Sequence, residues 1–267
     1  MDKDFLEVAI EAALKAGAIQ MESLSRPHEV TLKGVSNLVT EVDVACEDAI
    51  ISLVRSRFPD HSFLAEEGGE TAPGSDHLWI IDPLDGTTNY AHGLRRFCVS
   101  IGLAVKGRVE AGAVYNAVAD ELFTAVRGKG AWLNGERILV SRVKKVEDAL
   151  ICTGFSYDKG KRLGRDLVPY LKILPAAQSL RRTGCAALDL CDVAAGRFDG
   201  FWELNLNAWD VAAASLVIEE AGGRWTGIGG DLVDLYAREF LATNGLIHDE
   251  MVELIKSEPQ FKLEPVS

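Results

Sequence analysis

The feature that most constrains the fold is a change in hydrophobic periodicity near residue 60. Residues 5–24 and 45–54 carry apolar side chains at helical spacing, and Pro59 marks the end of the second helix. Beyond that point the apolar runs shorten to strand length and are separated by glycine-containing turns. These runs are residues 62–65, 78–81, 99–105, 109–114 and 122–126. The first half therefore predicts two helices over an antiparallel meander.

The second half alternates between strand and helix patterns, which is typical of an α/β arrangement. Strands are expected at 149–153, about 178–183 and 198–202, and helices at about 160–173, 185–195 and 208–221. Gly222-Gly223 predicts the end of the last of these helices. Because no linker separates the halves, we expect a single domain over residues 1–267. Its lobes would cover about 1–146 and 147–267, with a site in the cleft between them.

Charge and leader patterns exclude several classes of protein. The chain has 28 basic and 40 acidic residues, a net charge of −12, which argues against nucleic acid as the main ligand. The acidic start and the lack of long apolar runs predict no signal peptide and no membrane span, so we expect a cytoplasmic protein. The five cysteines show no CxxC spacing and are expected to be buried and reduced, and the five histidines are expected at the surface or in loops.

The most informative segment runs from Trp79 to Asn89. An apolar strand leads into Asp82, Pro83 has no N–H for strand pairing, and Asp85 is followed by Gly86, which permits a sharp turn. Two carboxylates and nearby carbonyl and hydroxyl oxygens make a set of hard ligands of the kind that Mg²⁺ prefers. A surface β-turn is the structural alternative, since the same residue types favour turns.

Further acids follow the same pattern. Glu66-Glu67 comes directly after an apolar strand, Asp210 stands at the start of an apolar helix, and Asp43 precedes the second helix. Each acid has a plain alternative, a solvated loop or a helix start. Because unpaired charge is costly where burial is expected, cations would explain why acids repeatedly follow apolar strands.

These residues resemble the inositol monophosphatase family of Mg²⁺-dependent, lithium-sensitive-type phosphatases. The segment from Asp82 to Tyr90 resembles the first signature of that family, and the segment from Trp209 to Gly223 resembles the second. Two more blocks fit, Lys33–Asp43 and Ala65–Gly68, and the likeness runs in order from about residue 5 to 255. The resemblance implies a mixed α+β and α/β fold, a layered α-β-α-β-α sandwich, and a homodimer.

The resemblance also implies roles for particular residues. Two or three Mg²⁺ ions would be held by Glu66, Asp82, the Leu84 carbonyl, Asp85 and Asp210. The attacking water would be positioned by Thr87, which Asp43 orients, together with Glu66. The phosphate would meet the backbone N–H groups of Gly86 and Thr87, and the alcohol would contact Asp85, Ala186 and Glu203, with Ser156 as a further candidate.

The implied activity is hydrolysis of a small-molecule phosphate monoester, with inositol 1-phosphate as the first choice. Alternatives in the same fold are fructose 1,6-bisphosphate, histidinol phosphate and phosphoadenosine phosphate, or a non-catalytic partner protein. Gly184-Cys185-Ala186-Ala187 is more similar to the inositol branch than to the histidinol-phosphate branch. Arg181-Arg182 would either meet a second phosphate or form structural ion pairs.

Overall fold

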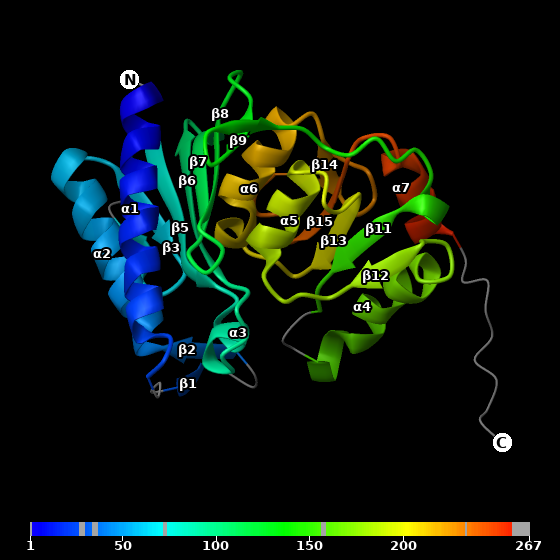
Figure 1. The fold of residues 1–267 in the computed structure, drawn as a ribbon, viewed down its shortest axis with the longest axis horizontal. Coiled ribbons are helices and arrows are strands. Elements are labelled where there is room, and N and C mark those ends of the chain that lie inside the picture. The colour runs from blue at the N-terminus through cyan, green and yellow to red at the C-terminus, as the bar shows by residue number, and fades with distance from the viewer. Residues whose placement is uncertain are drawn as a thin grey trace.

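The computed structural model describes residues 2–26, 30–33, 37–71, 74–155, 159–232 and 234–257. Helices and sheets alternate across the molecule in five layers, which confirms the α-β-α-β-α sandwich (Figure 1). Helices α1 (Asp2–Ser23) and α2 (Glu41–Arg57) form the first layer, close to the helices that the sequence predicts. A small hairpin, β1 (Val30–Lys33) with β2 (Asn37–Thr40), connects them.

The second layer is an eight-stranded sheet in the order β10-β9-β8-β7-β6-β5-β3-β4. From β5 to β10 it is an antiparallel meander, as expected, but β3 pairs parallel to β5, which the sequence did not predict. The parallel pairing places the end of β3, with Glu66 after it, beside the end of β5. The strands are β3 (Ser62–Ala65), β4 (Gly69–Thr71), β5 (His77–Asp85), β6 (Cys98–Val105), β7 (Arg108–Asn116), β8 (Glu121–Val126), β9 (Ala131–Leu133) and β10 (Glu136–Ile138).

Helices α5 (Ala186–Ala194) and α6 (Ala208–Glu220) form the central layer, between the two sheets (Figure 1). Helix α6 is rich in alanine and approaches the first sheet closely. A Cβ added at Gly102 of β6 or Gly112 of β7 would lie 3.0–3.1 Å from Ala213 of α6. These two glycines therefore allow the contact that brings the start of α6 to the end of β5.

The fourth layer is a five-stranded sheet in the order β12-β11-β13-β15-β14. Its strands are β11 (Leu150–Thr153), β12 (Ser179–Arg181), β13 (Gly200–Leu204), β14 (Arg224–Gly227) and β15 (Glu239–Thr243). Helices α4 (Lys159–Ile173) and α7 (His248–Lys256) cover its outer face as the fifth layer. A short 3₁₀ helix, Val146–Asp148, precedes β11.

The second half confirms the predicted alternation as far as α6 and then departs from it. Strands β14 and β15 and helix α7 were not predicted, and β15 runs antiparallel to β13 in an otherwise parallel region. The prediction for histidines was wrong at His248, which is fully buried between the hydroxyl groups of Thr226 and Thr243, each 3.0 Å away. The prediction for cysteines is confirmed in that all five are buried and unpaired.

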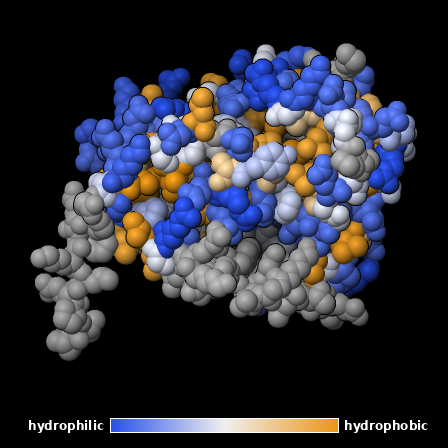
Figure 2. Space-filling view, turned by 180° about the vertical axis from the view of Figure 1, so that it is seen from behind, coloured by the Kyte–Doolittle hydropathy of each residue, from blue (hydrophilic) through white to orange (hydrophobic). Residues whose placement is uncertain are grey.

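The surface seen from behind is mostly hydrophilic, with apolar side chains in separate patches (Figure 2). Within the described residues, every helix is too short or too polar to cross a bilayer.

Candidate functional site

The end of β5, which carries Asp82 and Asp85, is irregular. Pro83 cannot donate to the strand ladder, and the pairing with β6 shifts register between Asp82 and Asp85. The Pro83 carbonyl accepts a hydrogen bond from the buried Gln20 side chain at 2.9 Å. The backbone N–H of Leu84 donates to Asp82 Oδ1 at 3.0 Å, so the Asp82 carboxylate is held against its own turn. Asp82 is buried and Asp85 is partly buried.

Asp43 and Asp210 occupy the same local position in two different helices. Each is the third residue of its helix and accepts a hydrogen bond from the backbone N–H of the N-cap residue. Asp43 Oδ2 lies 2.8 Å from the Thr40 nitrogen, and Asp210 Oδ2 lies 2.6 Å from the Asn207 nitrogen. The helix-start interpretation is therefore correct for both acids. It does not exclude a further role, because each carboxylate retains a second oxygen.

Glu66, which follows β3, forms one cluster with Asp82 and Asp85 at the end of β5 and with Asp210 at the start of α6. Burial raises the pKa of Asp82 well above its usual value, and the neighbouring charges of Glu66, Asp85 and Asp210 raise it further. Burial also raises the pKa of Asp85 to about 6 and of Asp210 to about 7. Raised values at several adjacent carboxyl groups mean that their negative charges are poorly compensated by protein groups.

Helix α3 (Thr87–Ala91) begins directly after the cluster, at Gly86. Gly86 has φ +92°, and a Cβ there would lie 3.0 Å from the carbonyl oxygen of Arg96, so both conformation and space favour glycine. The hydroxyl of Thr87 is buried, 3.1 Å from Asp43 Oδ1 and 3.0 Å from the Leu84 carbonyl oxygen. The hydroxyl has one proton and two possible acceptors here, so it donates a hydrogen bond to one of them. The lone pairs of the Thr87 oxygen remain available to accept a hydrogen bond from another donor.

The second half of the chain contributes the start of α5 and the acid Glu203. Asp85 Oδ2 accepts a hydrogen bond from the Ala187 backbone at 2.7 Å, which holds the start of α5, including Ala186, beside the end of β5. The pKa of Glu203 lies well above its usual value, mainly through burial and also through the charges of Asp189, Asp210 and Asp85. Glu203 thus extends the acidic cluster to strand β13.

All the predicted site residues except Ser156 lie in the described residues, and the contacts above connect them. Glu66, Asp82, Asp85 and Asp210 share one cluster, Thr87 bridges Asp43 and Leu84, and Glu203 adjoins the cluster from β13. Ser156 lies outside the described residues.

Sequence reasoning missed the residues that join helix α3 and the segment after it to helix α5 and the segment before it. The guanidinium of Arg96 forms ion pairs with Asp189 and Asp192 of α5. The amide of Asn89 donates to the carbonyl oxygens of Arg96 and Thr183 at 2.8 and 2.9 Å. Asn89 belongs to the first signature and could have been found there, whereas Arg96 has no local pattern that marks it.

The arginine pair Arg181-Arg182 has different surroundings for its two members. Arg181 donates to Ser179 Oγ at 2.7 Å and to the Leu180 carbonyl at 2.9 Å. Arg182 lies over the ring of Phe155, 5.7 Å from its centroid, and its charge lowers the pKa of Glu203 in part. Arg182 is therefore the member that acts on the acidic cluster.

A model of the inositol monophosphatase family matches residues 1–260, so the chain belongs to this family of phosphomonoesterases. It is 41% identical over 259 residues to an inositol-1-monophosphatase of Synechocystis sp., covering 96% of this chain and 90% of that one. It is 45% identical over 221 residues to the Nus factor SuhB of Haemophilus influenzae, covering 82% and 83% of the two chains. The solved inositol monophosphatase from Anabaena has a TM-score of 0.88 at 40% identity, covering 97% of this chain and 98% of that one.

Proposed function

We propose that this protein is a Mg²⁺-dependent phosphatase that hydrolyses inositol 1-phosphate by attack of water. The observation that carries the proposal is the cluster of Glu66, Asp82, Asp85 and Asp210, in which burial and mutual repulsion raise several pKa values. Membership of the inositol monophosphatase family and 41% identity to an inositol-1-monophosphatase support the substrate.

The donor set fits Mg²⁺. The ligands would be carboxylate oxygens and one carbonyl, which are the hard oxygens that this ion takes, and divalent cations would offset the uncompensated negative charge. We propose that two or three ions are held by Glu66, Asp82, the Leu84 carbonyl, Asp85 and Asp210. Bound Mg²⁺ would neutralise phosphate charge, lower the pKa of water and stabilise the leaving alkoxide.

Thr87 would position the attacking water. Its hydroxyl can donate a hydrogen bond to Asp43 or to the Leu84 carbonyl, and this orientation leaves a lone pair to accept a hydrogen bond from water. Glu66 would accept a second hydrogen bond from the same water and take its proton. This arrangement needs no protein nucleophile, because the residues orient a water and hold a proton.

The rest of the substrate would lie between the lobes. The backbone N–H groups of Gly86 and Thr87 would bind the phosphate. The inositol hydroxyls would contact Asp85, Ala186 and Glu203, whose carboxyl group can donate a hydrogen bond as well as accept one because its pKa is raised. We therefore propose that the chain works as one domain with its site between two lobes.

The proposal also covers the oligomeric state, the cellular location and the alternative functions of the protein. We propose a homodimer in the cytoplasm that binds neither nucleic acid as a main ligand nor membranes. The name Nus factor SuhB, which relatives at 43–45% identity carry, supports a partner-protein role as the second candidate function. Fructose 1,6-bisphosphate and histidinol phosphate are alternative substrates, and Arg182 is the cation placed to meet a second phosphate.

The test is phosphate release from inositol 1-phosphate, fructose 1,6-bisphosphate, histidinol phosphate and phosphoadenosine phosphate with millimolar Mg²⁺, and again with EDTA. The proposal predicts turnover that EDTA abolishes and a clear preference for inositol 1-phosphate. A preference for another phosphate would reassign the substrate, and no turnover by folded protein on any of them would leave the partner-protein role in its place.

A further inference from the structure

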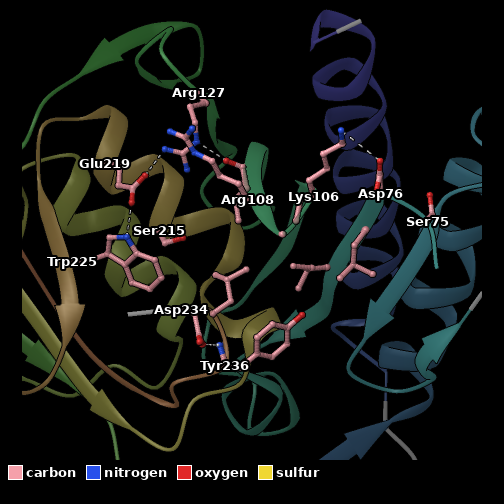
Figure 3. A pocket seen from close by; sticks show the side chains of 16 residues that line it. Ser75, Asp76, Lys106, Arg108, Arg127, Ser215, Glu219, Trp225, Asp234 and Tyr236 are labelled. Carbon is pink, nitrogen blue, oxygen red and sulfur yellow. Dashed lines mark hydrogen bonds and ion pairs between the residues drawn. The ribbon is translucent and has the colours of Figure 1, made fainter. Parts of the chain in front are cut away.

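A second pocket lies along the first half of β5, whereas the carboxylates lie along its second half. Its volume is about 510 Å³, within the range of about 300–1,000 Å³ that small-molecule sites occupy. Leu78 and Ile80 of β5 line it, whereas the acids of the candidate active site begin at Asp82, two residues further along the strand. Its other walls come from α6, from β14 and from the segment before β15, so it lies between the lobes (Figure 3).

The floor of this pocket is apolar and one of its walls is a fixed aromatic ring. The ring of Trp225 stacks on Phe240 with centroids 5.5 Å apart, and its indole N–H donates to Glu219 at 2.7 Å. The phenol ring of Tyr236 is largely exposed at the rim. The floor is made by Leu78, Ile80, Ala104, Val109 and Leu235.

Among the charged groups that line the pocket, Arg127 and Glu219 form an ion pair with each other and also bind neighbouring residues of the pocket wall. Arg127 donates to the Val109 carbonyl at 2.7 Å and to Glu219 at 2.7 Å. The other oxygen of Glu219 accepts the indole N–H of Trp225. Asp234 is also engaged, because it accepts the backbone N–H of Tyr236 at 2.7 Å. These acids are therefore poor candidates to bind a cationic ligand.

Two further cations, Lys106 and Arg108, flank the pocket from the tight β6–β7 turn (Figure 3). The turn is held in place because the Lys106 backbone N–H donates to the Asp76 carbonyl at 2.7 Å. The side chains are more loosely paired, since Lys106 lies 3.8 Å from Asp76 and Arg108 lies 3.8 Å from Glu110. Both basic side chains are more than 60% exposed, and such ion pairs contribute only about 0–1 kcal/mol. Turning them toward a ligand therefore costs little.

We propose that this pocket is an accessory binding site for an amphipathic organic anion, a ring or hydrocarbon body that carries a carboxylate, phosphate or sulfonate. The body would cover the apolar floor beside Trp225 and Tyr236, and the anionic group would be bound by Lys106 and Arg108. Binding there does not depend on the carboxylate cluster or on Mg²⁺.

The test uses calorimetric titration of the full chain with 2-naphthoate and with its neutral analogue 2-naphthamide, both in EDTA. We expect one saturable site, with 2-naphthoate bound about tenfold more tightly than 2-naphthamide, as a paired charge at a partly exposed site provides. Absence of a saturable site, or equal affinity for the two compounds, would overturn the proposal.

Two double variants with the same charge change locate the anion. Lys106→Ala/Arg108→Ala should reduce the affinity for 2-naphthoate to that for 2-naphthamide and leave the amide unaffected. The matched control, Lys144→Ala/Lys145→Ala, removes two exposed cations away from the pocket and should change neither affinity. Retained 2-naphthoate affinity in the first variant, or an equal loss in the control, would contradict the assignment.

A third variant and a competition experiment locate the ring. Ala104→Leu adds side-chain volume to the floor and should weaken both compounds, with circular dichroism as the check on folding. Inositol 1-phosphate with Mg²⁺ should leave 2-naphthoate binding unchanged, because the two sites are lined by different residues of β5. Displacement of 2-naphthoate by inositol 1-phosphate would assign its binding to the active site instead and overturn the proposal.

Discussion

Gly154 is a residue whose small size is required by the neighbouring Glu203 carboxylate. A Cβ at this position would lie 2.1 Å from one carboxylate oxygen of Glu203 and 2.2 Å from the other. No real contact is this short, so a larger side chain must displace the Glu203 carboxylate. Gly154 therefore positions Glu203, and through it the part of the substrate that we propose Glu203 contacts.

Gly154→Ala is predicted to reduce kcat/KM for inositol 1-phosphate by about tenfold or more but to change the free energy of unfolding by less than about 1 kcal/mol, because the flexible end of Glu203 can move aside. Steady-state kinetics and urea unfolding measure the two effects. The control is Gly164→Ala in α4, where a Cβ meets nothing within 4 Å and the change should be neutral or slightly stabilising.

A double-variant cycle separates this clash from other effects of the substitution. Glu203→Asp withdraws the carboxylate by one methylene, so the clash should be relieved in Gly154→Ala/Glu203→Asp. The double variant should then have about the same kcat/KM as Glu203→Asp alone, which is a strongly non-additive result. Simple additivity of the two losses in log kcat/KM would show that Gly154 acts in another way.

At the scale of elements, the position of α5 depends on one arginine. Arg96 is paired with Asp189 and Asp192, and Asp189 also accepts hydrogen bonds from Thr183 and from the Cys152 thiol. Burial raises the pKa of Asp189, and the charge of Arg96 opposes that rise. Since α5 supplies the Ala187 N–H to Asp85, this network links helix position to the acidic cluster.

Arg96→Met is predicted to destabilise the protein by about 3–5 kcal/mol, because it leaves the buried Asp189 without its cationic partner, whereas Asp192 keeps its ion pair with Arg197. Urea unfolding at neutral pH measures the loss. Arg57→Met removes an exposed ion pair with Glu11 and should cost less than about 1 kcal/mol. Equal losses in the two variants would mean that Arg96 does not hold α5 in place.

Local sequence patterns predict some of these elements, whereas long-range packing is not encoded in them. The helix starts at Asp43 and Asp210 and the strand end at Asp82 are local patterns, so they were predicted from spacing and residue type. The pairing of β3 with β5 and the approach of α6 to the sheet are long-range packing events, and no local pattern encodes them. His248 was misjudged for this reason, since the two threonines that satisfy its ring come from neighbouring strands.

At the scale of the whole molecule, stability should depend on pH through the acidic cluster. The folded-state pKa values of Asp85, about 6, and Asp210, about 7, lie above their ordinary value of 3.8. Between about pH 4 and their folded-state pKa values, these two carboxyl groups stay protonated in the folded protein but are ionised in the unfolded chain. The contribution of the cluster to the free energy of unfolding is therefore fully present below about pH 4 and is lost as pH rises to about 7.

Mg²⁺ should reverse this loss, because it binds the ionised carboxylates of the folded protein. The difference in Tm between Mg²⁺ and EDTA is predicted to be small near pH 5 and to increase toward about pH 8. Taking the difference at each pH removes the opposite effect of His248, whose pKa burial lowers to about 4 and which destabilises the fold at acid pH. A Mg²⁺ effect that is independent of pH would contradict the proposed ligands.

The most direct test of the whole account is the Asp85→Asn variant, measured for both activity and stability. Asparagine keeps the size of Asp85 and can still accept the Ala187 N–H, but it removes one charge from the cluster. We predict that phosphate release from inositol 1-phosphate falls by at least about a hundredfold at saturating Mg²⁺. We also predict that the metal-free variant has a higher Tm than the metal-free wild type at neutral pH. Retained activity, or a lower metal-free Tm, would contradict the proposal that Asp85 and its neighbours form a metal site.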